Sequence, residues 1–189
     1  MAGDLWVCRA CDLASLAAEL RPSRILSIAE PGFRNLTPAG IDPDRHLHLN
    51  FDDIAEPISG YVAPSERHVA SIIDLAADLT KTDRILVHCQ AGISRSSAAA
   101  LIMLAVRNPG HERTIAMRLR EEGPWFVPNR LMVHIADRLI GRGALLSAAL
   151  ASMGPPTMLL NSRPVQLPLS LSAARFSERM LSNLEPGSS

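Results

Sequence analysis

Cys89 and Arg95, with five residues between them, are the two side chains in this sequence best suited to covalent chemistry. A cysteine thiolate is a strong nucleophile. An arginine guanidinium can bind two oxygens of a phosphoryl group at once, which a lysine ammonium cannot do. The residues between them can present backbone N–H groups to the same anion, and Gly92 permits the backbone angle that a tightly curled loop needs. The spacing therefore predicts an anion cradle with a thiol at its base.

The flanking sequence predicts the elements that would position this cradle. Ile85 to Val87 is an apolar run typical of a buried strand, and Ser96 to Val106 has the apolar pattern of a helix. The loop would then lie at a helix N-terminus, where free N–H groups and the helix dipole favour an anion. We expect the phosphoryl oxygens to be bound by Arg95 and by the loop residues Gln90, Ala91, Gly92, Ile93 and Ser94. We also expect Ser96 to donate its hydroxyl to the departing sulfur and His88 to orient the loop.

An acid for proton transfer would have to come from a second loop at the same edge of the sheet. Residues 46–51 alternate polar and apolar side chains, as a strand does, and end at Asp52 and Asp53. Because the carboxyl ends of parallel strands meet at one edge, both carboxylates can reach the cradle. Glu56 is a weaker candidate. The alternative is that these acidic residues are only solvated turn residues.

The whole chain predicts an α/β fold. Apolar patterns predict strands at 5–8, 24–29, 46–51 and 84–89, and helices at 13–20, 65–79, 96–106, 111–121, 129–140 and 144–152. Asp12 and Ser65 are predicted to cap the first two helices. Strands that are separated by helices pair in parallel, so we expect a central, mostly parallel sheet of about four or five strands flanked by helices.

The composition excludes several classes of function. The 189 residues carry 19 basic and 19 acidic side chains, scattered along the chain, which argues against a nucleic-acid stripe or a basic membrane patch. No apolar run is long enough to span a bilayer, and the first residues do not resemble a targeting signal. Three cysteines without a disulfide pattern favour the reducing cytoplasm. The preference for arginine over lysine is associated with GC-rich, bacterial genomes.

Residues 1–152 are expected to form the catalytic domain, and residues 153–189 a C-terminal tail. The tail begins with several prolines, and residues 165–171 alternate in the manner of an edge strand. Residues 172–184 have the pattern of a last amphipathic helix. We expect this tail to be either a packed extension of the domain or a segment that binds a partner.

Three other features have simple structural interpretations. Cys8 and Cys11 have the spacing of half a metal or redox site, but no second pair completes one, so they are predicted to be two separate thiols. His46 and His48 lack an evident third ligand and are predicted to be surface or loop-bracing residues. The pair at 125–126, Trp-Phe, is predicted to pack in the core.

The pattern His88-Cys89-x-x-Gly92-x-Ser94-Arg95-Ser96 resembles the signature of the cysteine-dependent protein tyrosine phosphatases. Its Ser-Arg-Ser ending is most similar to the dual-specificity branch, and the resemblance covers roughly residues 20–140. The resemblance implies the fold of that superfamily and hydrolysis of phosphorylated proteins or small phosphomonoesters. It also implies a phosphocysteine formed on Cys89 and no requirement for a metal or another cofactor.

The resemblance also bears on the acid and on one supporting residue. A Phe-Asp-Asp sequence of this kind occurs in one small branch, in which the second aspartate is the acid. This favours Asp53 over Asp52, which would then brace the loop. Pro128-Asn129 resembles a Pro-Asn in dual-specificity enzymes, so Asn129 is expected to be a supporting residue.

Three alternatives to a protein phosphatase remain at this stage. The first is a phosphatase for a small-molecule phosphomonoester, although the uncharged loop at 90–94 argues against a highly phosphorylated one. The second is a non-catalytic module that binds phosphorylated residues, which would be expected to lack the cysteine or the acid. The third is a rhodanese-like sulfur transferase, which would not need the extended motif or an upstream aspartate.

Overall fold

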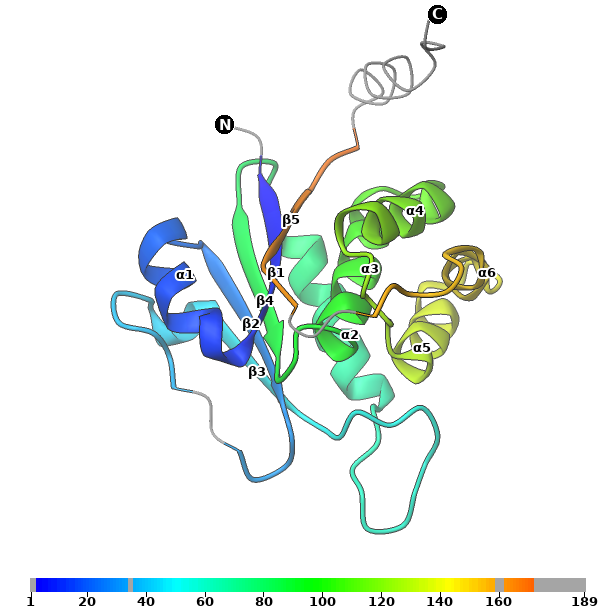
Figure 1. Ribbon diagram of the computed structural model, residues 1–189, viewed down its shortest axis with the longest axis horizontal. Coiled ribbons are helices and arrows are strands. Elements are labelled where there is room, and N and C mark those ends of the chain that lie inside the picture. The colour runs from blue at the N-terminus through cyan, green and yellow to red at the C-terminus, as the bar shows by residue number, and fades with distance from the viewer. Residues whose placement is uncertain (1–2, 34–35, 159–161, 172–189) are drawn as a thin grey trace, which may run out of the picture.

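A five-stranded sheet with helices on both faces forms the centre of the molecule (Figure 1). The structure is a computed structural model and describes residues 3–33, 36–158 and 162–171. The strands are β1 (Asp4–Arg9), β2 (Arg24–Ala29), β3 (His46–Asn50), β4 (Arg84–Cys89) and β5 (Val165–Pro168). Their order is β3-β2-β4-β1-β5, and all pairs are parallel except β1 with β5. The predicted fold class, a mostly parallel α/β sheet, is confirmed.

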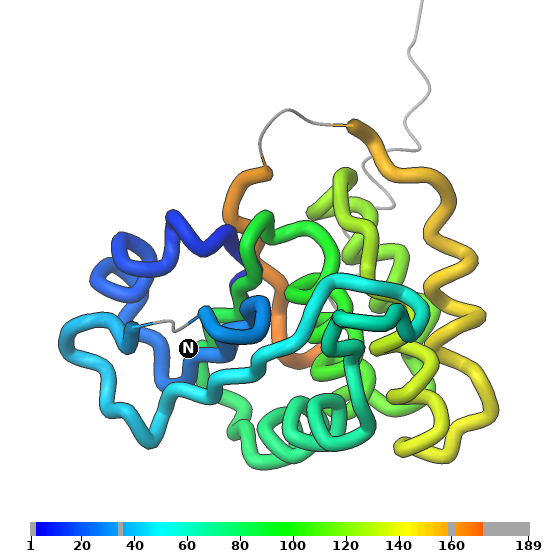
Figure 2. Tube along the Cα trace, turned by 90° about the horizontal axis from the view of Figure 1, so that it is seen from below, coloured from blue at the N-terminus to red at the C-terminus, as the bar shows by residue number. Residues whose placement is uncertain are grey.

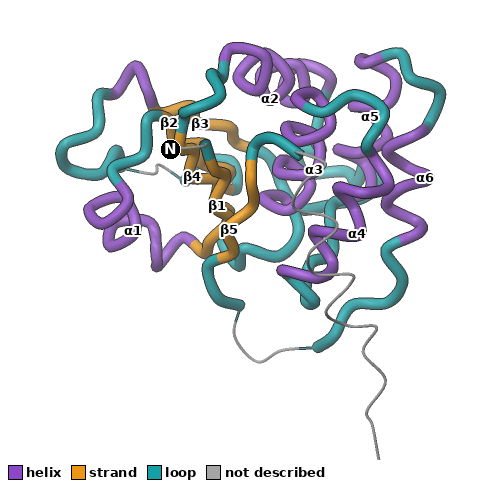
Figure 3. Tube along the Cα trace, turned by 90° about the horizontal axis from the view of Figure 1, so that it is seen from above, coloured by secondary structure: helices purple, strands orange, loops and turns teal. Residues whose placement is uncertain are grey.

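Six α-helices cover the sheet unequally. They are α1 (Leu13–Leu20), α2 (Glu66–Asp78), α3 (Arg95–Arg107), α4 (Glu112–Glu122), α5 (Arg130–Ile140) and α6 (Leu145–Ser152). Figures 1 and 3 show α1 on one side of the sheet and α2 to α6 on the other. The six helices predicted between residues 13 and 152 are all present, with ends that differ by at most one residue.

The core is divided by β4, whose side chains alternate between the two faces of the sheet. Ile85 and Val87 pack in the large cluster against α3, whereas Leu86 packs with Leu16 and Ile25 under α1. Every residue of α3 from Arg95 to Ala105 is buried. Small side chains in its first turns allow the sheet and the neighbouring helices to approach it closely. This packing fixes the start of α3, which is the part that faces the cradle.

Local sequence signals explain where several helices begin. The Ser65 side chain accepts from the backbone N–H of His68, and His68 accepts in return from Ser65, which fixes the start of α2. The prediction that Asp12 caps α1 is wrong. Its carboxylate accepts instead from Arg9, at 2.8 and 2.9 Å, because the guanidinium offers two charged donors nearby.

Residues 162–171 pack against the body of the molecule. β5 pairs with β1, and Leu167 and Leu169 are buried. The Asn108 side chain at the end of α3 holds this segment by donating to the Leu169 carbonyl and accepting from the Leu171 N–H. The strand is shorter than the alternation at 165–171 predicted. The helix predicted at 172–184 lies outside the described residues.

The parallel strands β1 to β4 all end at the lower edge of the sheet in Figure 1. The long loop between β3 and α2 hangs below this edge and lies in the foreground of Figure 2, which is viewed from below. The side chains that could do chemistry therefore meet at one end of the sheet. No helix in the described part of the chain is long and apolar enough to cross a membrane.

Candidate active site

Cys89 ends β4 and Arg95 begins α3, so the five residues from Gln90 to Ser94 form a tight strand-to-helix loop, here called the cradle loop. Gly92, in the middle of the loop, has a φ of 67°. A Cβ atom at this position would lie 2.8 Å from the backbone of Cys8. Any other residue would thus combine an unfavourable backbone angle with a clash. Glycine allows the loop to curl directly against the end of β1.

The Cys89 thiol lies at the base of this loop. The side chain is 2% exposed, and its sulfur lies 3.2 Å from the hydroxyl oxygen of Ser96, which is also buried. A hydroxyl at this distance can donate to a thiolate sulfur. Ser96 therefore lies where the sequence predicted it, within hydrogen-bond distance of the Cys89 sulfur.

Arg95 is held in one orientation by two acceptors. Its Nη1 donates to the Phe51 carbonyl at 2.8 Å, and its Nη2 pairs with Glu30 at 2.5 Å. Its Nε is buried and has no hydrogen-bond partner among the described residues; the nearby Asp53 Oδ2 is 3.9 Å away. A buried, charged N–H without an acceptor is costly, so this position is suited to an oxygen of a bound anion.

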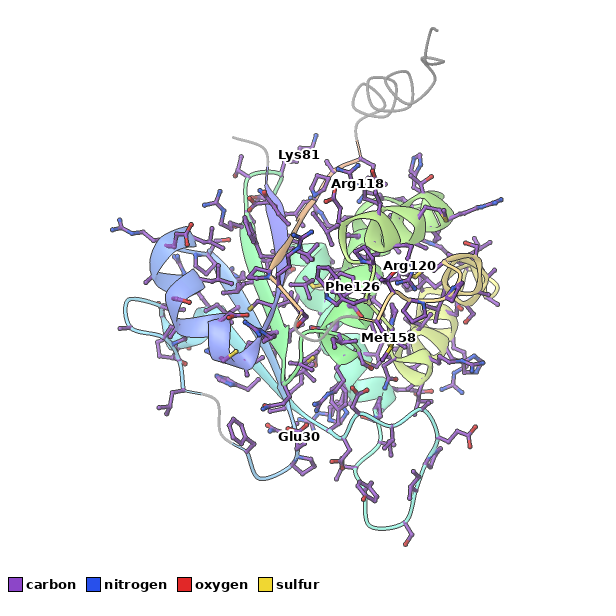
Figure 4. All side chains as sticks on the ribbon, in the orientation of Figure 1. Glu30, Lys81, Arg118, Arg120, Phe126 and Met158 are labelled. Carbon is purple, nitrogen blue, oxygen red and sulfur yellow. The ribbon has the colours of Figure 1, made fainter. Side chains whose placement is uncertain are left out.

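Glu30 is a site residue that the sequence reasoning missed. It follows β2 directly, at the same sheet edge as Asp52 and Asp53. Burial acts to raise the pKa of its carboxyl, but the hydrogen bond and charge of Arg95 outweigh burial and lower it. Glu30 is therefore an anion that fixes the guanidinium. Its position just after a strand is the one sequence feature that could have suggested a role in the site. Figure 4 shows Glu30 near the lower ends of the strands.

The adjacent residues Asp52 and Asp53 have different hydrogen-bond partners. Asp53 faces the cradle loop: its Oδ1 accepts from the Ser94 hydroxyl at 2.6 Å and from Asn129 Nδ2 at 2.8 Å. Asp52 faces its own loop and accepts from the Val62 N–H at 2.7 Å, while its N–H donates to the Val62 carbonyl. Asp53 thus lies at the mouth of the cradle, and Asp52 closes the β3–α2 loop. Glu56 is exposed farther along that loop.

Asn129 links three parts of the site. Its Oδ1 caps α5 by accepting from the Met132 N–H, and its Nδ2 donates to Asp53 and to the Ile54 carbonyl. The backbone N–H groups of Asn129 and Val127 donate to carbonyls of the cradle loop. The segment before α5 therefore ties the loop that carries Asp53 to the cradle loop.

Two further contacts support the cradle loop from the other side. The Ser162 hydroxyl donates to the Ala91 carbonyl at 2.6 Å, and the Ala10 N–H donates to the Gln90 carbonyl at 3.3 Å. Local sequence patterns could not predict these two contacts, because both depend on long-range packing. His88 is buried beside Cys89 but points to the opposite face of the sheet, toward Ser27.

The remaining candidates do not form a second chemical site. Cys8, Cys11 and Cys89 are free thiols, and no group of three possible metal ligands occurs in residues 3–33, 36–158 and 162–171. Trp125 and Phe126 are buried, which confirms the predicted core packing. An open cavity of about 590 Å³ lies between α5, α6 and the segment 126–128, but neither Cys89 nor Arg95 lines it. Figure 4 shows Arg120 and Phe126, which line this cavity, among the helices and away from Glu30.

Comparison with solved structures identifies the fold. The human tyrosine phosphatase-like serine/threonine/tyrosine-interacting protein is similar with a TM-score of 0.58 and 17% identity, over 75% of this chain and 97% of that one. The Cydia pomonella PTP-2 phosphatase has a TM-score of 0.55 and 15% identity, over 71% and 84% of the two chains. Human DUSP28 has a TM-score of 0.53 and 14% identity, over 78% and 94%.

No family model and no curated protein matches this sequence. At these low identities, the structural likeness establishes the fold, which is that of the tyrosine and dual-specificity phosphatases. The fold that the motif at 88–96 implied is therefore confirmed.

Proposed function

We propose that this protein is a metal-independent phosphomonoester hydrolase that works through a phosphocysteine, with phosphorylated proteins as its substrates. One observation carries the proposal. Asp53 reaches the cradle loop through the Ser94 hydroxyl at 2.6 Å and lies 3.9 Å from the buried Nε of Arg95. An acid, an anion clamp and the Cys89 thiol thus meet at one strand-to-helix junction, which is the set that double displacement at phosphorus requires.

In the first step the Cys89 thiolate attacks phosphorus in line with the leaving oxygen. The other phosphoryl oxygens accept from backbone N–H groups of the cradle loop and from Arg95. Asp53 gives its proton to the leaving oxygen as the P–O bond breaks. Since Ser94 and Asn129 both donate to Oδ1, the proton is placed on Oδ2, the oxygen that lies toward Arg95.

In the second step the Asp53 carboxylate takes a proton from a water molecule, which attacks phosphorus. The P–S bond breaks, inorganic phosphate leaves, and Cys89 departs as a thiolate. The Ser96 hydroxyl, 3.2 Å from the sulfur, stabilises that negative charge. Asp53 regains its proton in this step, so the cycle closes without a metal or another cofactor. The thiolate requires a reducing compartment, which favours the cytoplasm as the place of action.

The surroundings of the cradle favour a single phosphoryl group attached to an apolar or aromatic neighbour. The cradle loop carries no charged side chain that would bind further phosphates. Exposed apolar side chains lie on the two adjacent loops: Phe33 near Glu30, and Ile58, Tyr61 and Val62 after Asp53. These residues could contact a phosphotyrosine ring and its flanking residues. The same surface would accept an apolar small-molecule phosphomonoester, which is the second candidate substrate class.

Hydrolysis of p-nitrophenyl phosphate in the presence of EDTA tests the proposal. We expect turnover by the wild type, none by Cys89→Ser, and normal turnover by the matched control Cys11→Ser, which alters an exposed thiol. Phosphotyrosine, phosphoserine and phosphothreonine peptides, compared with alkyl phosphates, would then rank the substrates. Vanadate binding without turnover would point to a binding module, and sulfur transfer from thiosulfate would point to a rhodanese-like enzyme.

A further inference from the structure

A chain of four polar side chains runs from a surface loop to the residue next to the nucleophile. Ser27, on β2 and fully buried, lies between two histidine rings: its Oγ is 2.6 Å from His46 Nε2 and 2.5 Å from His88 Nε2. His46 Nδ1 is in turn 3.0 Å from the Thr37 hydroxyl. The catalytic steps described above do not use Ser27, His46 or Thr37.

The hydrogen-bonding capacity of these groups allows only two directions for the chain. A serine hydroxyl has a single hydrogen, so Ser27 can donate to one ring and must accept from the other. In the first direction Thr37 donates to His46, His46 Nε2–H donates to Ser27, and Ser27 donates to His88 Nε2. In the second direction every one of these bonds is reversed. The choice decides which nitrogen of His88 carries its proton.

Both directions hold the His88 ring in the same orientation. His88 Nε2 bonds to Ser27 in either case, while His88 Nδ1 is buried and makes no hydrogen bond to any residue that the structure describes. The hydrogen bond to Ser27 is therefore the side-chain contact that fixes the rotation of this ring beside Cys89.

We infer that Ser27 and His46 are positioning residues for the catalytic cysteine: their hydrogen bonds fix the His88 ring, and through it the end of β4 at which Cys89 lies. Burial keeps both rings neutral near pH 7, as either direction of the chain requires, because it lowers the pKa of each histidine to about 4. Other titratable groups at the chain are His48, whose ring centroid lies 3.8 Å from that of His46, and Cys8, which pairs with His88 in register. This inference rests on the proposed role of Cys89 as the nucleophile.

The tautomers can be measured directly in the wild-type protein. Long-range ¹H–¹⁵N correlation spectra of the imidazole rings at pH 7 distinguish an Nδ1–H from an Nε2–H histidine. Because the Ser27 hydroxyl has one hydrogen, we expect opposite tautomers, with Nε2–H on one of the two rings and Nδ1–H on the other. The same tautomer at His46 and His88 would overturn the inference, whether or not the protein hydrolyses phosphate esters.

Variants test whether the chain matters for Cys89. Ser27→Ala removes the central hydroxyl and should lower kcat about tenfold with little change in KM, as expected for the loss of a group that orients a reactive residue. The pH profile of Cys89 alkylation by iodoacetamide should differ from that of the wild type. Ile25→Val, two residues earlier on β2 and buried under α1, is the matched control for a small packing change and should leave that profile in place.

A second pair of variants covers the case in which Ser27→Ala fails to fold. His46→Gln keeps an N–H that can reach Ser27, whereas His46→Leu does not, so the glutamine variant should retain more activity and a profile nearer to wild type. Alkylation needs no substrate, so it reports on Cys89 even if the phosphatase proposal fails. Profiles for Ser27→Ala or His46→Leu that coincide with the wild type would contradict the inference.

Discussion

Adjacent residues in this site have different roles because their side chains face different partners. Asp52 and Asp53 follow the same strand, yet Asp52 closes its own loop through Val62 while Asp53 reaches Ser94 and Asn129. Both partners of Asp53 belong to segments that also hydrogen-bond to each other. The carboxylate is therefore fixed relative to Arg95, as an acid must be for in-line transfer.

Replacing each aspartate by asparagine should separate these roles. We expect Asp53→Asn to lower kcat about 100-fold or more, since it removes the proposed proton donor. Asp52→Asn keeps a side-chain oxygen that can accept from the Val62 N–H. Its kcat should therefore fall by less than about fivefold, as expected when one hydrogen bond is weakened. Steady-state kinetics with phenyl phosphate would measure both.

The leaving group supplies a control for this pair. p-Nitrophenolate is a good leaving group that needs little protonation. Asp53→Asn should therefore slow the hydrolysis of p-nitrophenyl phosphate less than the hydrolysis of phenyl phosphate. Equally mild effects of the two substitutions on both esters would show that neither aspartate is the acid.

The geometry of the site was predictable from the sequence where the residues involved lie close together in the chain. The loop between Cys89 and Arg95 could be recognised from its residue types and spacing alone. Glu30 could not, because its contact with Arg95 spans 65 residues and depends on the direction in which the guanidinium points. Ser162 and Ala91 are likewise distant in the chain, at 71 residues apart.

At the scale of elements, periodicity predicted the strands and helices but left two matters open. The order of the strands depends on long-range pairing, which no local pattern encodes. The burial of His46 was also not predicted, because alternation shows that a strand has two faces but cannot show how far along a face the rest of the chain covers it. His46 and His48 share one face of β3, yet His46 is buried and bonded to Thr37 of the β2–β3 loop, whereas His48 is exposed.

The short strand β5 lies in the segment expected to be a tail, and its contacts predict a large contribution to stability. Leu167 is fully buried where β5 pairs with β1. Leu167→Ala should therefore lower the free energy of unfolding by about 2–4 kcal/mol, through lost apolar contact and the cavity left behind. Ser170→Ala, on an exposed residue of the same segment, should change it by less than about 0.5 kcal/mol. Urea denaturation measures both. A Leu167→Ala protein as stable as wild type would mean that this segment is separable from the domain.

At the scale of the whole molecule, the two faces of the sheet have different chemistry. The α3 face carries the Cys89 thiol and the large apolar core, and the α1 face carries the buried chain of Ser27, His46 and His88. Buried neutral histidines are sensitive to acid, because the unfolded chain binds protons more readily than the folded one. The sheet edge that carries Cys89 is therefore supported by buried groups that make the stability of the fold sensitive to pH.

The free energy of unfolding should consequently fall as the pH decreases below about 6.5, the ordinary pKa of histidine. Burial lowers the pKa of His46 and His88 to about 4, so between these values only the unfolded chain is protonated at these positions. Within this range each of these histidines lowers the free energy of unfolding by about 1.4 kcal/mol for every unit by which the pH falls. Above this range neither histidine makes the free energy of unfolding depend on pH.

Urea denaturation between about pH 7 and pH 5 measures this dependence and avoids most carboxylate titration. His46→Gln should reduce the slope by the contribution of one histidine, about 1.4 kcal/mol per pH unit, and His111→Gln, on an exposed residue, should leave it unchanged. A wild-type stability that stays constant across this range would show that the two rings are not held neutral by the fold.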